Sequence, residues 1–211
     1  DGSLGTRTAA CSQPYPGGHD HGVMSIEPAT LVELMTAATA GGLRCAIHAI
    51  GDVANAHVLD AFATTGAWGC VEHAQLVAHA DIPRFARLGV AASVQPEHAL
   101  DDRDITDRLW ANQTAVPYPL RSLADAGVTL LLGSDAPVAP LDPWAAIAGA
   151  VWRTRDGREP WHPEQALDAA TALAASTRAG SGNEAAVIAP GADADLVVCE
   201  RDPLTASELE L

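Results

Sequence analysis

The feature that most constrains the fold of this chain is a regular alternation of short apolar segments with longer segments of helical periodicity. Apolar residues at helical spacing, with proline near the start or glycine near the end of several segments, predict helices over 28–42, 53–66, 79–89, 119–127, 142–155 and 163–177. Short apolar runs predict strands over 43–50, 69–75, 90–96 and 128–135. A polar stretch over 97–118 interrupts the rhythm. The chain is therefore predicted to be an α/β protein.

Strands that alternate with helices are expected to be parallel and joined by right-handed crossovers. Their nearly continuous apolar runs are typical of strands buried on both faces, which a doubly wound sheet and a (β/α)8 barrel both provide. Polar residues at the strand ends favour the barrel, whose sites lie at its carboxyl-terminal face. We therefore predict about four βα units, the C-terminal half of a (β/α)8 TIM-type barrel, over 1–188.

The last part of the chain departs from the alternation. Residues 190–204, "PGADADLVVCERDPL", indicate a turn, a short strand and a second turn. We expect 189–211 to be a tail that leads into a small β-sandwich domain.

Each predicted strand ends in polar side chains: His48, then His73 with Gln75, then Gln95, then Asp135. Taken singly, each histidine is more typical of a hydrogen-bonded core residue, and Asp135 in "GSDAP" of a turn or helix cap. In a parallel barrel, however, these side chains converge on one mouth. Two imidazoles and a carboxylate form a ligand set that suits zinc or a similar divalent ion.

Composition excludes some partners. The net charge of −15 argues against binding to nucleic acid or to an anionic membrane surface. The four cysteines are scattered without a C-x-x-C pair, which favours a reduced, cytoplasmic protein. All twelve basic residues are arginine, and with the abundant alanine this indicates a GC-rich, bacterial genome.

Several motifs, taken in order, resemble the metal-dependent amidohydrolase superfamily. They are "DGSLGTRTAA", "AIHAIGD", "VEHAQL", "SVQPEHALDD", "PLRSLADAGV", "GSDAPV" and "PGADADLVV". The branch that contains N-substituted formamide deformylase is the most similar. The resemblance implies a distorted barrel with one or two divalent metals, zinc foremost, in the intact enzyme.

The resemblance also implies residue roles. The family's fifth and sixth strands end in metal-binding histidines, which match His48 and His73. Its eighth strand ends in an aspartate, matching Asp135, which helps to bind metal and accepts a proton from the attacking water. Gln75, Gln95 and His98 would lie near the mouth and contact substrate.

Two elements of that family are absent here: a first-strand H-x-H pair, and a carboxylated lysine from the fourth strand. The chain contains no lysine, and its abrupt start at "DGSLG" fits the C-terminal part of a longer polypeptide. His19 and His21 in "GGHDHG" have H-x-H spacing but lie among glycines, which predicts a solvated loop instead.

A histidine ligand needs its second ring nitrogen held by a backbone carbonyl or a carboxylate. Asp52 and Glu72 are the nearest carboxylates in the sequence, but Glu72 precedes His73 on a strand and should face the other way.

The resemblance and the strand-end residues together predict hydrolysis of a C–N bond other than a peptide bond, in a small amide, formamide or cyclic amide, by metal-activated water. The chain alone is expected to have little or no turnover. The alternative is a non-catalytic binding or assembly module, a half-barrel completed by another chain or by a homo-oligomer. A nucleotide-binding domain is disfavoured because the chain has neither G-x-G-x-x-G nor G-x-x-x-x-G-K-[ST].

Overall fold

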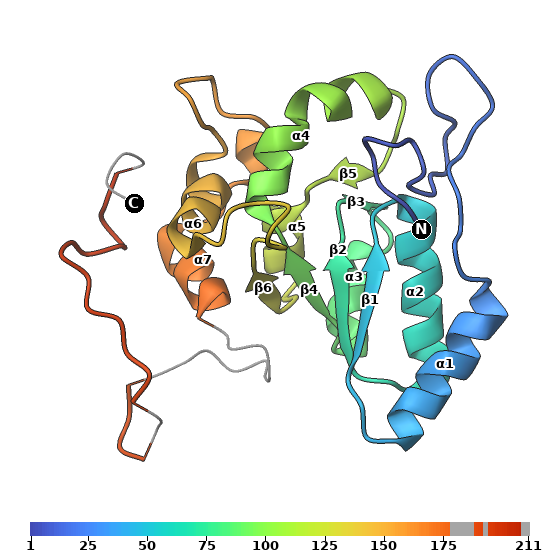
Figure 1. Cartoon of the computed structure of the whole chain (residues 1–211), viewed down its shortest axis with the longest axis horizontal. Helices are drawn as coiled ribbons and strands as arrows, with labels where there is room; N and C mark the ends of the chain where they lie inside the picture. The colour runs from blue at the N-terminus through green and yellow to red at the C-terminus, as the bar shows by residue number, and fades with distance from the viewer. Residues whose placement is uncertain (178–187, 192–193, 208–211) are drawn as a thin grey trace.

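The computed structural model describes residues 1–177, 188–191 and 194–207 (Figure 1). The helices are α1 Pro28–Ala40, α2 Asp52–Thr65, α3 Ile82–Leu88, α4 Pro96–Leu109, α5 Leu120–Asp125, α6 Pro143–Trp152 and α7 Ala169–Ser176, with a short 3-10 helix η1 at Pro163–Gln165. The strands are β1 Cys45–Ala49, β2 Gly69–His73, β3 Leu76–Val77, β4 Ala91–Val94, β5 Val116–Pro117 and β6 Leu130–Leu132. No helix in these ranges is long and apolar enough to span a bilayer.

Four strands form one parallel sheet in the order β1-β2-β4-β6. Each strand is separated from the next by at least one helix, which confirms the predicted α/β alternation and the parallel pairing. The strands β3 and β5 form a separate antiparallel pair. Figure 1 shows the arrows of β1 and β2 pointing toward the end of the molecule where α4, the β3–β5 pair and the N-terminus lie. The carboxyl ends of these strands therefore meet one region of the protein.

The expectation that the strands are buried on both faces holds for the inner strands and fails for the first one. Val71 and Ala92, neighbours on one face of β2 and β4, are buried, and so are Cys70 and Ala91 on the other face. On β1, by contrast, Ala46 and His48 are exposed while Cys45 and Ala49 are buried. Because β1 pairs only with β2 in the described chain, one of its faces lacks the cover that a closed barrel provides.

The polar stretch at 97–118 contains a helix that the sequence pattern did not predict. The helix α4 begins at a proline, as is favoured in a first helical turn, and buries few large apolar side chains, chiefly Leu100 and Leu109. Its acidic side chains pair with arginines that follow α6: Arg158 binds Asp104, and Arg155 binds Asp101. The helix is therefore held by a narrow apolar face and by ion pairs. Its sequence for this reason shows little of the apolar spacing by which a helix is predicted.

Two apolar clusters hold the fold together. The larger one lies between the parallel sheet and its helices and includes Phe62, Phe85 and Leu123. The smaller one joins the N-terminal segment to α4 and the β3–β5 pair, and its members are Leu4, Ala9, Cys11, Tyr15, Ile50, Leu76, Ala99, Leu109, Trp110, Ala115, Tyr118 and Trp161. This second cluster fixes residues 4–15 beside the carboxyl ends of the strands.

The tail differs from the expectation. Residues 194–200 form no strand in the structure, and Leu196, Val197 and Val198 are exposed. The start of the predicted β domain is therefore not formed in this segment, where no second strand is paired with it. Part of the tail lies outside the described residues, and the division into 1–188 and 189–211 stays a prediction.

Candidate metal centre

His48 lies one residue before the end of β1, and its side chain is 42% exposed. Its Nε2 lies 3.1 Å from the carbonyl oxygen of Gly2 and 3.3 Å from Oδ1 of Asp1. Both neighbours are acceptors, so Nε2 carries the ring proton and donates it. In the form of the ring that can bind a metal ion, the free lone pair is then on Nδ1.

His73 is the last residue of β2 and has a left-handed backbone conformation, with φ of 76°. Its Nδ1 lies 2.9 Å from Oε1 of Gln95, while Nε2 of Gln95 donates to the carbonyl of Ser93 at 3.4 Å. That second contact orients the amide oxygen toward the histidine, so Nδ1 of His73 is the donor. The free lone pair of His73 is therefore on Nε2.

The two imidazoles lie edge to face, with ring centroids 4.7 Å apart. Burial lowers the pKa of His73, an effect that the Gln95 hydrogen bond and the charge of Asp135 oppose. A histidine whose pKa is below its usual value of about 6.5 is neutral at pH 7, which is the form that binds a metal ion. Each ring of the pair has one nitrogen held by a hydrogen bond, and burial favours the neutral form of His73.

Asp135 follows β6 at the same edge of the sheet. It is exposed, has φ of 54°, and its charge acts on His73. In the described residues, no group of three or more histidine, cysteine, aspartate or glutamate side chains is close enough together to hold a metal ion. The structure therefore brings His48 and His73 into contact. Asp135 lies at the same edge of the sheet but is not close enough to complete a set of three ligands with them.

The three remaining predicted residues differ in position. Gln75 is buried just after β2, and its carbonyl accepts a hydrogen bond from the backbone of Tyr118. Gln95 precedes α4 and holds His73. His98, in the first turn of α4, stacks on His73 with ring centroids 6.1 Å apart, and its buried Nε2 has no hydrogen-bond partner. Of the three, His98 alone presents an unpaired polar atom beside the histidine pair.

The groups that hydrogen-bond to the ring nitrogens of His48 and His73 are not the carboxylates nearest to them in the sequence. Asp52 accepts a hydrogen bond from the backbone of Ser12, and Glu72 accepts one from the thiol of Cys70. Glu72 is the register partner of His48, so the two project from the same face of the sheet, and the left-handed backbone of His73 departs from the strand alternation that the prediction assumed. Sequence reasoning missed Asp1 and Gly2 as partners of His48. The only signal was that "DGSLG" and "AIHAIGD" occur in one chain.

His19 and His21 lie in an exposed loop, as predicted. Nδ1 of His21 lies 3.0 Å from the carbonyl of Cys11, which accounts for one of its nitrogens. This pair is on a turn between the N-terminal segment and α1, and it contributes nothing to the histidine pair at the strand ends.

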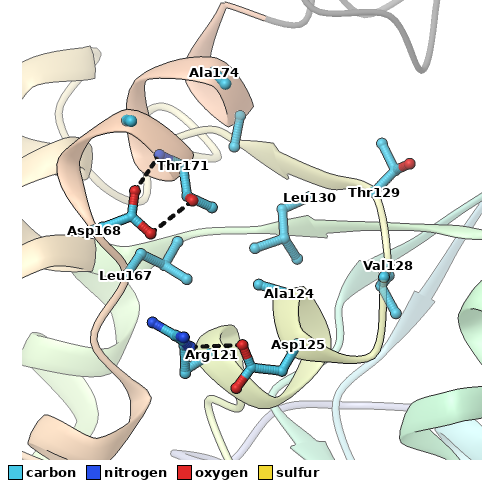
Figure 2. A pocket seen from close by; sticks show the side chains of 13 residues that line it. Arg121, Ala124, Asp125, Val128, Thr129, Leu130, Leu167, Asp168, Thr171 and Ala174 are labelled. Atoms are coloured by element: carbon cyan, nitrogen blue, oxygen red, sulfur yellow. Dashed lines mark hydrogen bonds and ion pairs between the residues drawn. The ribbon is translucent and has the colours of Figure 1, made fainter.

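A hollow of about 630 Å³ lies between α5, β6 and α7 (Figure 2). It opens beside Val128 and Thr129, which precede β6, whereas Asp135 follows that strand. Its charged side chains are already paired: Arg121 with Asp125, and Asp168 with Thr171. This hollow is therefore at the opposite end of the strand from the histidines, and the charged side chains named here are all paired.

The donors present fit a divalent cation. Two imidazoles from adjacent strands and a carboxylate from a third are the nitrogen and oxygen ligands that zinc and similar ions accept in catalytic sites. The hydrogen bonds to Gly2 and Gln95 supply the outer contacts that such ligands require.

Comparison with known proteins identifies similar proteins of one family. The model of the amidohydrolase family matches residues 1–211. Protein LONG AFTER FAR-RED 3 of Arabidopsis thaliana is 34% identical over 94% of this chain and 37% of its own length. N-substituted formamide deformylase of Arthrobacter pascens is 31% identical over 85% of this chain and 35% of its own length.

Among solved structures, an uncharacterized metal-dependent hydrolase from Pyrococcus horikoshii superimposes with a TM-score of 0.85 and 34% identity, over 99% of this chain and 44% of that one. The chain thus spans less than half the length of the proteins it matches. The predicted fold class, a partial α/β barrel, is confirmed.

Proposed function

The chain belongs to the amidohydrolase family, and on that basis we propose that it carries part of the active site of a metal-dependent hydrolase that cleaves C–N bonds other than peptide bonds. The observation that carries the proposal is the contact between His48 and His73 at adjacent strand ends, each with one ring nitrogen held and the other free. The substrate class is a small amide, formamide or cyclic amide. A relative that matches most of this chain is named N-substituted formamide deformylase.

The ligands would be Nδ1 of His48, Nε2 of His73 and the carboxylate of Asp135. A divalent ion held there, zinc foremost, would supply an activated water near neutral pH and would polarise the substrate carbonyl. Asp135 accepts the proton of the attacking water and later gives it to the leaving nitrogen. Its exposure and its free carboxylate oxygens suit that exchange.

The other side chains keep the site in order. Gln95 holds His73 in the tautomer that leaves Nε2 free. The buried Nε2 of His98 has no partner within the chain and would pair with a polar atom of the substrate, and Gln75, two residues after His73, would also contact it. One or two ions are proposed for the whole enzyme. With no lysine and no first-strand H-x-H pair, the 211 residues alone are proposed to have little or no turnover.

A second candidate function is a binding or assembly module with no catalysis. It is favoured by one observation, the position of β1 and β6 as the outer strands of the parallel sheet. Such strands present unpaired backbone groups that a further chain or a second copy would cover. The cytoplasmic location and the bacterial origin expected from composition stay predictions.

The first prediction concerns metal content. In the natural full-length protein, His73→Ala should lower bound zinc at least tenfold and abolish hydrolysis in a screen of N-formyl and N-acyl compounds, because it removes a nitrogen ligand. Elemental analysis of the purified protein measures the zinc.

His79→Ala is the matched control, since His79 is an exposed histidine before α3. Equal zinc in His73→Ala and the control would contradict the assignment. Stoichiometric zinc without hydrolysis of any compound in the screen would favour the binding module.

A further inference from the structure

The carboxylate of Asp1 is fully buried, although it belongs to a loop. Its two oxygens accept hydrogen bonds from three backbone amides: Ala10 at 3.0 Å, Ile50 at 3.1 Å and Gly51 at 2.8 Å. One of these amides lies in the N-terminal segment, and the other two lie in the turn between β1 and α2. The carboxylate therefore ties that segment to the end of the strand that carries His48.

Glycine makes this close contact possible. A Cβ at Gly51 would lie 1.9 Å from the carbonyl oxygen of Ala10, and a backbone atom cannot move aside for it. The same carbonyl accepts a hydrogen bond from the amide of Val53 at 3.1 Å. The segment and the turn thus touch through backbone atoms, which holds Asp1 beside the end of β1.

Asp1 also reaches the imidazole. Its Oδ1 lies 3.3 Å from Nε2 of His48, and the carbonyl of the next residue, Gly2, lies 3.1 Å from the same nitrogen. Both acceptors are placed by the buried carboxylate, one directly and the other through the adjoining peptide. The buried carboxylate of Asp1 is poorly solvated, so it favours an N–H group facing it over a bare ring nitrogen. Nε2 of His48 therefore keeps its proton.

We propose that Asp1 is a positioning residue for His48: it fixes the ring orientation and the tautomer that leaves Nδ1 unprotonated and directed away from the N-terminal segment. The inference deepens the proposed function and rests on it for the role of His48 as a ligand. Asp1 is not itself a ligand, because three amides and the imidazole occupy its oxygens.

A purely structural role is the competing explanation, and the chain contains a matched control. The carboxylate of Asp52 is also buried and also ties the N-terminal segment to the start of α2, by accepting a hydrogen bond from Ser12 at 2.8 Å. Unlike Asp1, it has no contact with an imidazole in the described structure. A loss of anchoring alone should therefore affect both aspartate variants in the same way.

The test is long-range ¹H–¹⁵N correlation NMR of the natural full-length protein, first without metal and then titrated with zinc. The wild type should show His48 protonated on Nε2. Asp1→Asn should produce a mixture of His48 tautomers and weaken zinc binding by about 10- to 100-fold. Asp52→Asn should keep the wild-type tautomer.

The proposal is overturned if His48 of the wild type is protonated on Nδ1, a measurement that needs no variant to fold. It is also overturned if Asp1→Asn leaves the His48 signals unchanged, or if Asp52→Asn alters them equally. If the tautomer responds to Asp1→Asn but no protein binds zinc, the positioning role stands and the proposed metal-dependent function fails.

Discussion

At the scale of single residues, chemistry at the strand ends depends on which nitrogen of each histidine is free. His48 and His73 hold their protons on opposite ring nitrogens, because one faces the acceptors of Asp1 and Gly2 and the other faces Gln95. The two imidazoles therefore have different free nitrogens, Nδ1 in His48 and Nε2 in His73. The identity of a ligand residue alone does not determine this.

The cysteines provide a prediction at this scale. Burial raises the pKa of Cys11 to about 11 and that of Cys70 to about 12, the latter with a contribution from the charge of Glu72. A raised pKa keeps the thiol protonated until the pH approaches that value, so at pH 8 about one molecule in a thousand or fewer carries the reactive thiolate. Cys199, in contrast, is exposed.

Iodoacetamide at pH 8 should therefore modify Cys199 at least tenfold faster than Cys11 or Cys70 in the folded chain, as measured by peptide mass spectrometry. All three should react at similar rates in urea, which serves as the control. Equal rates in the folded chain would show that the buried thiols are accessible.

At the scale of elements, the helix predicted over 163–177 is two elements: η1, then α7 from Ala169. The break comes at Asp168, whose side chain accepts hydrogen bonds from the backbone amide and the hydroxyl of Thr171, each at 2.8 Å. An aspartate that caps a new helix competes with continuation of the previous one. The periodic pattern runs through this position and conceals the break.

Asp168→Ala should destabilise the chain by about 1 kcal/mol at pH 7, measured by urea unfolding, because it removes the cap. The hydrogen bonds from Thr171 hold the pKa of Asp168 below its usual value. A lowered pKa in the folded state means that the ionised carboxylate stabilises the fold above pH 4 and that this contribution is lost as pH falls through the folded-state pKa.

The difference between Asp168→Ala and wild type should therefore shrink toward pH 2.5. Asp168→Asn is the control, since asparagine caps helices about as well as aspartate and should retain most of the stability at both pH values. A destabilisation by Asn that equals that by Ala would contradict the capping role.

At the scale of the whole molecule, the parallel sheet has two outer strands, β1 and β6, and no described strand covers their free edges. Open edges are templates for pairing with another chain. The 211 residues expressed alone should therefore self-associate at micromolar concentration, which sedimentation velocity would detect.

Ala46→Lys, an exposed position on β1, should reduce this association, because a charged side chain discourages pairing at an edge. Ala40→Lys, at the exposed end of α1, makes the same substitution away from the edge and should have no effect. A monodisperse monomer for the unsubstituted chain would show that these edges do not drive assembly.

Much of the fold was predictable because the local spacing of apolar residues indicates most of its strands and helices. The four parallel strands lie within the predicted apolar runs, and most helices begin and end within a few residues of their expected bounds. The exceptions have a common cause. The helix α4 is stabilised by arginines that follow α6, and the tail strand would need a partner, so both depend on distant residues.

The sequence by itself determined the α/β alternation, because strand and helix periodicity is a local property, and the order of its motifs indicated the family and the candidate ligands. Only the tertiary structure decided that Asp1 and Gly2, rather than Asp52, hold His48, and that Gln95 holds His73. The contacts of His48 join segments far apart in the chain through the backbone approach that Gly51 permits. No local pattern encodes such an approach, because its geometry exists only after the core has packed.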